Sequence, residues 1–239
     1  MDRFTYINIF ETKGIEYLAI IAFLVLLIPF WLFLNKKAKI SRQIRKASGI
    51  LSANALNIPL GLFFSKNHTW THLEKSGTAK VGLDDLLLHL TGEVKLNCLK
   101  NRDETVKKGD FLAEIDQEGK RLRIYSPISG KILLTNQLVQ ESPELLNEDP
   151  YGQGWICKIQ PSNWVEETKT CLLAEEAVKW STKELERFKD FMALSIVKYT
   201  PKPAMVILQD GGELSDKALS AMPGEIWQDF QEEFMNQCL

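Results

Sequence analysis

The sequence predicts a mainly β domain flanked by an N-terminal transmembrane helix and a mostly helical C-terminal extension. Short alternating apolar segments, separated by turn residues, fill the middle of the chain. An unbroken apolar run precedes them, and apolar residues at helical spacing follow them. We expect four regions: an N-terminal segment with the transmembrane helix (1–35), a basic juxtamembrane linker (36–60), a β domain (61–164) and a helical extension (165–239).

Composition limits the possible functions. With 239 residues, 45% of them hydrophobic, the chain can form one well-packed domain with flanking parts. The formal net charge of -2 argues against a nucleic-acid partner. The four cysteines show no CxxC spacing, so neither a metal site nor a redox dithiol is expected. Buried structural thiols are the better interpretation.

Residues 17–34 form the apolar run, which is about as long as a bilayer core requires. It ends in Asn35-Lys36-Lys37, without the small residues of a peptidase site, so we expect an uncleaved anchor. More cations follow the run than precede it. The positive-inside rule then predicts a single-pass protein of the cell membrane, with its N-terminus outside, its C-terminal domains in the cytoplasm and the lipid bilayer as a partner.

The central region is predicted to consist of short strands and one helix. The helix is expected over 84–90, with Asp84 near its start and Gly92 at its end. A tight connection at Gln117 to Lys120 indicates a hairpin. The expected strands are 78–81, 93–99, 111–115, 121–124, 131–134 and 155–159.

Three motifs occur in order between residues 65 and 164. They are Asn-His-Thr-Trp at 67–70, Tyr-Ser-Pro-Ile-Ser-Gly at 125–130 and Asn-Glu-Asp-Pro-Tyr-Gly at 147–152. In sequence and spacing this region resembles the glycine cleavage system H protein. The resemblance implies a lipoyl-like barrel-sandwich hybrid that displays a lysine at a hairpin tip, with lipoic acid attached to it through an amide bond.

The lysine of that family precedes Tyr-Ser-Pro by six residues, which places it at Gly119 in this chain. Glycine carries no amine, and Lys120 lies next to it. The site is therefore either inactive, with no cofactor, or shifted by one residue, with lipoate on Lys120. We favour the inactive site because the family has small residues after the lysine, whereas this chain has Arg121 and Leu122.

No catalytic residues are predicted, and we do not expect an enzyme. His68, His72 and His89 lack a nucleophile or metal pattern and are interpreted as structural histidines. Asp84 with Asp85 is explained by the start of a helix. Gly211-Gly212 lacks the pattern of a phosphate-binding loop and indicates a turn.

The C-terminal region carries two helix signals. Ser181 and Glu184 have the spacing of a capping box, which predicts that a helix begins there. Its apolar face comprises Leu185, Phe188, Met192 and Ile196. A strand is expected over 204–208, and Pro223 is expected to open a last helix. The aromatic stripe of that helix is expected to dock on the barrel or on a partner subunit.

Two functions follow from these patterns. The first is a membrane-anchored, non-lipoylated structural or interaction subunit of a respiratory or redox complex, with other membrane or redox subunits as partners. Residues 11–14 and 29–31 favour it, because this N-terminal part resembles small membrane subunits of high-molecular-weight cytochrome complexes. The alternative is a lipoyl carrier modified at Lys120, acting in glycine cleavage-like or redox group transfer.

Overall fold

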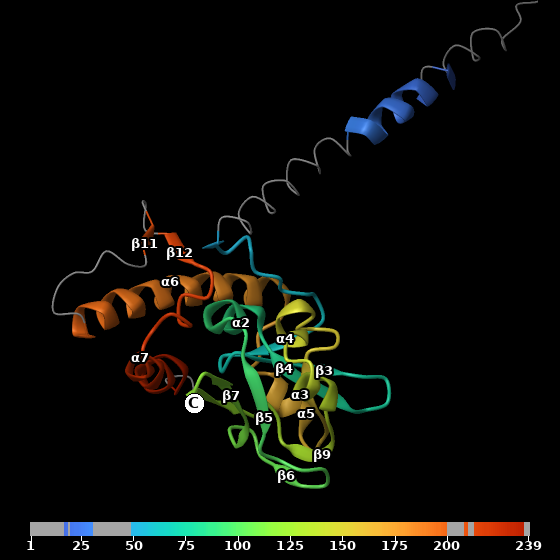
Figure 1. The fold of residues 1–239 in the computed structure, drawn as a ribbon. Helices are drawn as coiled ribbons and strands as arrows, with labels where there is room; N and C mark the ends of the chain where they lie inside the picture. The colour runs from blue at the N-terminus through green and yellow to red at the C-terminus, as the bar shows by residue number, and fades with distance from the viewer. Residues whose placement is uncertain (1–16, 19, 31–48, 200–207, 210–212, 237–239) are drawn as a thin grey trace, which may run out of the picture. The chain divides into compact units, whose positions relative to one another are not determined.

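The computed structural model of the protein divides into two units, residues 1–48 and 49–239. Figure 1 shows the course of the chain. The structure describes residues 17–18, 20–30, 49–199, 208–209 and 213–236.

The larger unit contains a six-stranded antiparallel sheet with the order β2-β3-β4-β10-β9-β6. Its strands are β2 (Phe63–Ser65), β3 (Thr69–Leu73), β4 (Ala79–Leu83), β6 (Thr105–Val106), β9 (Gly130–Thr135) and β10 (Trp155–Pro161). Gly130 is required at the β9–β10 pair, because a Cβ there would collide with the backbone oxygen of Gln160. The glycine that closes the second sequence motif thus permits close strand pairing.

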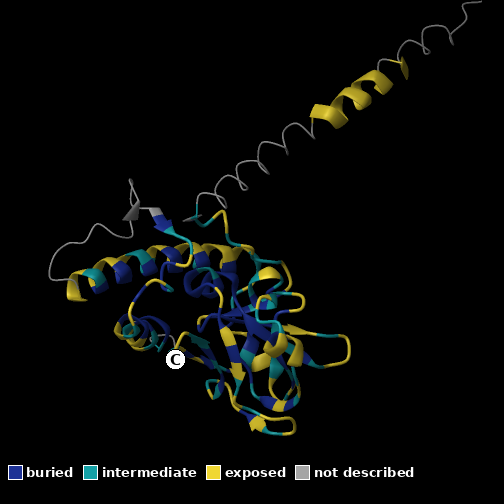
Figure 2. Cartoon of the chain, in the orientation of Figure 1, coloured by how far each residue is buried: buried dark blue, intermediate teal, exposed yellow. Residues whose placement is uncertain are grey.

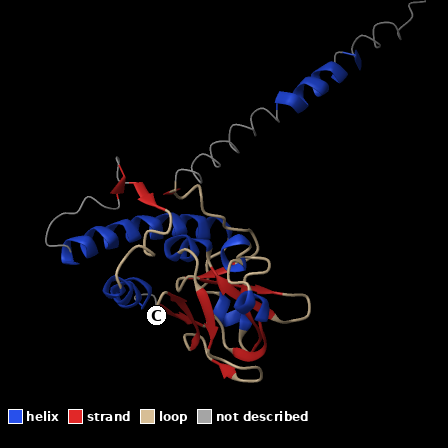
Figure 3. Ribbon diagram, viewed as in Figure 1, coloured by secondary structure: helices blue, strands red, loops and turns tan. Residues whose placement is uncertain are grey.

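A second antiparallel sheet has three strands in the order β5-β7-β8. These strands are β5 (Lys95–Cys98), β7 (Phe111–Gln117) and β8 (Lys120–Tyr125). Leu112, Ile115, Leu122 and Ile124 are buried in the common core, and in β8 the buried residues alternate with more exposed ones. The mainly β, sandwich-like architecture expected from the sequence is confirmed (Figure 3).

Short helices connect the strands. Asp84 caps α2 (Asp85–Thr91), because its Oδ1 accepts a hydrogen bond of 2.8 Å from the backbone N–H of Leu87. Tyr151 of the third sequence motif braces the same helix, since its hydroxyl accepts from the N–H of Asp85 at 3.0 Å. The others are α3 (Gln137–Glu141), α4 (Leu145–Glu148) and α5 (Trp164–Thr168).

The C-terminal extension packs against the β domain. It contains α6 (Ala174–Tyr199), β11 (Leu208–Gln209), β12 (Glu213–Ser215), α7 (Gly224–Asp229) and the π-helix η1 (Phe230–Met235). Trp227, Phe230 and Phe234 are buried, as the aromatic stripe predicted. Figure 2 colours the chain by burial. Docking of the last helix on this chain's own domain is therefore observed, because α7 contacts β8 and η1 contacts α6.

The predicted start of the first C-terminal helix was wrong. The capping box at Ser181 does not start a helix, because α6 already begins at Ala174. Ser181 and Glu184 lie within α6, and both side chains are buried. The expected linker contains β1 (Ile50–Leu51), which pairs with β12. Most of the strand predicted over 204–208, and the turn at Gly211-Gly212, lie outside the described residues.

The structure does not support the predicted transmembrane helix either. Among the ranges that the structure describes, no helix has the length and apolarity needed to cross a membrane. Within the run 17–34, the structure describes residues 17–18 and 20–30. Residues 19 and 31–34 lie outside the described residues. The single-pass, cell-membrane localisation is corrected accordingly.

Candidate functional site

The β7–β8 hairpin turns in two residues. Glu118 and Gly119 have φ values of 53° and 86°, and Gln117 pairs with Lys120. Two positive φ values are the signature of a type I′ turn, which matches the twist of a hairpin. The side-chain amide of Gln117 donates to the carbonyls of Thr91 (2.8 Å) and Glu93 (3.0 Å). The predicted hairpin is therefore confirmed, and its tip is tied to the end of α2.

Gly119 lies six residues before Tyr125, at the position where the H-protein resemblance places the attachment lysine. It is exposed, and a Cβ built there would meet no other atom within 4 Å among the described residues. The turn thus has open space around Gly119 but no side chain in it. Nothing at this position can form an amide.

Lys120 is the first residue of β8, directly after the turn, and it is half-buried. Its Nζ donates to the backbone oxygen of Ser220 at 2.6 Å and to that of Met222 at 3.4 Å. The same nitrogen lies 5.3 Å from the centroid of the Trp227 ring, within cation–π range. The amine of the candidate attachment residue is therefore held by the C-terminal extension.

The two residues after Lys120 lie differently from each other. Arg121 is exposed, and its guanidinium pairs with Asp116 at 3.2 Å and Glu114 at 3.5 Å. Leu122 is fully buried in the core, so it does not crowd the surface of the turn. Of the two residues thought to hinder an enzyme that reads this hairpin, only Arg121 is at the surface.

The extension also contacts the free edge of β8. The backbone N–H of Arg123 donates to the side-chain oxygen of Gln231 at 2.6 Å. Because β8 is the last strand of its sheet, this bond satisfies a donor that would otherwise face solvent. Lys120 and Arg123 are thus two points on one strand that the same segment covers.

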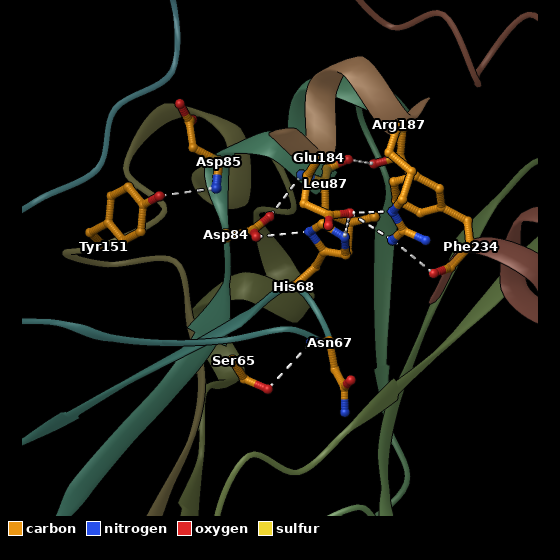
Figure 4. A network of polar contacts seen from close by, with 11 residues as sticks. Ser65, Asn67, His68, Asp84, Asp85, Leu87, Tyr151, Glu184, Arg187 and Phe234 are labelled. Atoms are coloured by element: carbon orange, nitrogen blue, oxygen red, sulfur yellow. Dashed lines mark hydrogen bonds and ion pairs between the residues drawn. The ribbon is translucent and has the colours of Figure 1, made fainter. Parts of the chain in front are cut away.

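A second contact between extension and domain surrounds His68, which is completely buried. Its Nδ1 lies 2.9 Å from Asp84 Oδ2, and its Nε2 lies 4.0 Å from Glu184 Oε2. Figure 4 shows Asp84 on one side of the ring and Glu184 with Arg187 on the other. The structural role expected for His68 rests on this network, whose α6 members lie more than a hundred residues further along the chain.

Aromatic and charged groups close over the same histidine. The ring of Phe234 is stacked on that of His68 with 5.7 Å between centroids. The guanidinium of Arg187 lies 3.7 Å from the centroid of Phe234 and donates to Glu184 at 2.6 Å. Sequence reasoning missed this cluster, although the i, i+3 pair of Glu184 and Arg187 was a readable signal.

A third contact pairs His89 of α2 with acids of both regions. Its Nδ1 lies 2.8 Å from Asp216 of the extension, and its Nε2 lies 3.5 Å from Asp85. Burial alone would lower the pKa of His89, but the hydrogen bonds to Asp216 and Asp85 outweigh it and raise the pKa to about 9. The imidazole is therefore a cation at neutral pH and ties the extension to α2.

The remaining polar side chains do not form a competing site. No group of three or more potential metal ligands occurs in the part of the chain that the structure describes. Burial raises the pKa of the Cys98, Cys157 and Cys171 thiols. These thiols are thus unreactive structural groups, whereas Cys238 lies outside the described residues.

Two packed antiparallel sheets with a lysine beside a projecting hairpin turn define a lipoyl-like domain. A family model described as "Glycine cleavage H-protein" matches residues 62–185, which is more than half of the chain. The chain therefore belongs to the glycine cleavage H-protein family.

Two individual relatives agree with this assignment. A probable glycine cleavage system H protein of Thermococcus gammatolerans is 38% identical over 120 residues, covering 50% of this chain and 89% of that protein. The glycine cleavage system H protein of Cronobacter sakazakii is 39% identical over 110 residues, covering 46% and 85%. A crystal structure of the Mycobacterium marinum H protein shares 25% identity over 44% of this chain and 87% of that one, with a TM-score of 0.41.

The family assignment decides between several predictions. It agrees with a non-catalytic protein, because H proteins are carriers. It favours the lipoyl-carrier alternative over a subunit of a membrane complex, and it does not confirm the expected lack of a cofactor. The N-terminal similarity to subunits of cytochrome complexes, and with it a role in electron transfer, receives no support from these matches.

Proposed function

We propose that this protein is a lipoyl carrier of the H-protein type, with Lys120 as its attachment residue. The observation that carries the proposal is the position of this lysine directly after the two-residue turn of the β7–β8 hairpin. Family membership gives that hairpin its meaning. The choice of Lys120 as attachment residue is part of this proposal, and so are the domain boundaries given above and any partner proteins.

The residues at the tip fit attachment at Lys120 and not at Gly119. Lipoate is held through an amide, so the site must supply a primary amine, and Lys120 has one. A carrier also needs a rigid support for its arm. Gln117 and the Asp116–Arg121 pair hold the base of the turn. When bound, lipoate supplies a dithiolane that accepts and passes on a chemical group or redox equivalents.

A second candidate function is an unmodified member of the family that serves as an interaction scaffold. The specific observation in its favour is the engagement of the Lys120 amine by Ser220 and Met222, together with the glycine at the counted position. Under this alternative the domain would bind partner proteins without carrying a group. Removal of Lys120 would then leave those interactions intact.

Mass spectrometry of the full chain, produced in cells that lipoylate their own H protein, separates the two candidates. We expect a fraction of the protein to carry one lipoyl group, located at Lys120 by peptide mapping. The adduct should disappear in Lys120→Ala and persist in Lys95→Ala, which changes an exposed lysine of β5. An unmodified mass under these conditions, or an adduct on another lysine, would contradict attachment at Lys120.

A further inference from the structure

One face of the hairpin is covered by this chain's own C-terminal segment, residues 216–231, which we call the cap segment. Its carbonyls at Ser220 and Met222 accept from Lys120 Nζ, and its Gln231 accepts from the N–H of Arg123. Trp227 lies beside the same amine. The cap segment therefore contacts β8 at its first residue and again three residues further on.

The cap segment has an attachment of its own that does not involve Lys120. The backbone N–H groups of Lys217 and Leu219 donate to the carbonyls of His89 and Leu90, at 2.8 and 3.0 Å. The ion pair of Asp216 with His89 adds to them. The amine of Lys120 can therefore be released from the cap segment without detaching that segment from α2.

Acylation of Lys120 requires its nitrogen to be free. The reaction forms an amide bond between Nζ and the carbonyl carbon of an activated acyl donor, whose leaving group departs while the nitrogen gives up a proton. The nitrogen attacks with its lone pair, so it must be deprotonated and able to turn toward the acyl donor, and the hydrogen bonds to Ser220 and Met222 oppose that turn. A modifying enzyme must also surround the amine, in space that Trp227 occupies.

We propose that the cap segment controls acylation of Lys120, so that the amine becomes available only when residues 220–227 move away from β8. The biological purpose of this inference rests on the proposed carrier function. The cover over the Lys120 amine does not depend on that function. In the described part of the chain, no atom lies within 4 Å of a Cβ built on Gly119, one residue away. The cap is thus specific for the lysine and leaves the tip of the turn open.

Amine labelling of the native full chain tests the cap directly. A small acetylating reagent is applied for increasing times, and the modification of each lysine is followed by peptide mass spectrometry. We expect Lys120 to react at least about tenfold more slowly than the exposed Lys95 and Lys183, because charged hydrogen bonds must first break. Equal rates at Lys120 and at these two lysines would overturn the inference.

A variant sharpens the test. Trp227→Leu removes the ring beside the amine and the indole bond to the Leu219 carbonyl (2.8 Å), but it keeps an apolar side chain in the core. It should speed labelling of Lys120 several-fold and leave Lys95 unchanged. Gln228→Ala alters an exposed neighbour in the same helix and should change neither rate. A Lys120 rate that stays slow in folded Trp227→Leu would contradict the cap.

The cap and the carrier function can fail separately. Fast labelling of Lys120 in the wild type would contradict control by the cap segment, and the proposal of attachment at Lys120 would still stand. Lys120 could instead be labelled slowly in the wild type and faster in Trp227→Leu, with no lipoyl adduct in either protein. That result would confirm the cap and contradict the carrier function. Because wild-type labelling needs no substitution, the inference is tested even if Trp227→Leu does not fold.

Discussion

Two of the contacts between the C-terminal extension and the β domain differ in depth. Around His68 it inserts a fully buried ring, Phe234, and a buried carboxylate, Glu184, into the domain. At Lys120 it offers two backbone carbonyls to a half-buried amine on an edge strand. The first contact fixes the extension to the domain, whereas the second covers the amine of the candidate attachment residue and contributes much less to the fold.

The largest effect is expected at the deep contact. Phe234→Ala should lower the free energy of unfolding by about 3–5 kcal/mol, because it leaves a cavity beside His68, Phe188 and Phe230. Chemical denaturation of the full chain measures this. Leu194→Ala, at a side chain that is 73% exposed on α6, should change stability by less than about 0.5 kcal/mol. Similar losses in both variants would mean that Phe234 is not part of a deep, stabilising contact.

A second substitution tests the polar part of the deep contact. Asp84→Ala removes both the cap of α2 and the partner of the buried His68 Nδ1, so we expect a loss of about 2–4 kcal/mol. Asp190→Ala, at an exposed acid of α6, is the matched control and should have little effect. A loss below about 1 kcal/mol in Asp84→Ala would show that the network is not stabilising.

The ion pair of His89 gives the attachment of the cap segment a pH dependence. The pKa of His89 is about 9 in the folded protein and about 6.5 when unfolded, so its contribution is fully present below pH 6.5 and is lost as the pH rises through 9. The stability difference between wild type and His89→Gln should therefore shrink by up to about 3 kcal/mol between pH 6 and pH 10. Denaturation at both pH values measures it.

His72→Gln is the control for this measurement, because His72 lies in β3 and is exposed. A difference between wild type and His89→Gln that is the same at both pH values would show that the imidazole is not held as a cation between Asp85 and Asp216.

The smallest stability effect is expected at the shallow contact. Lys120→Ala should lower the free energy of unfolding by about 1 kcal/mol. The amine is half-buried, and water can replace it as the hydrogen-bond donor to the Ser220 and Met222 carbonyls. Lys95→Ala should cost less still. A loss in Lys120→Ala as large as that in Phe234→Ala would show that Lys120 is part of what holds the extension, and the distinction between the two contacts would fail.

Local signals predicted much of the β domain. Asp84 caps its helix, the hairpin turns between Gln117 and Lys120, and Leu122 and Ile124 alternate inward as strand periodicity requires. These features depend on residues a few positions apart. The start of α6 was misplaced because Ser181 and Glu184 match a capping box, but both are buried inside a helix that begins at Ala174, and Glu184 lies near His68.

The surroundings of the candidate site were less predictable. The position of Lys120 beside the turn follows from the sequence, but its contacts with Ser220 and Met222 join residues about one hundred positions apart. The aromatic stripe of the last helix indicated that it docks somewhere, without indicating where. Only the fold shows that it docks beside the lysine that the family resemblance had singled out.

The central claim is that Lys120 is an attachment residue whose amine is covered, next to an uncovered Gly119. Initial rates of lipoylation by one lipoate-attaching enzyme should be compared for the wild type and for Gly119→Lys combined with Lys120→Ala. We predict slow modification of the wild type at Lys120 and faster modification of the double variant at position 119, although the positive φ there strains a side chain. Equal rates would contradict the cap, and a wild type that is never modified while the double variant is would contradict the carrier function.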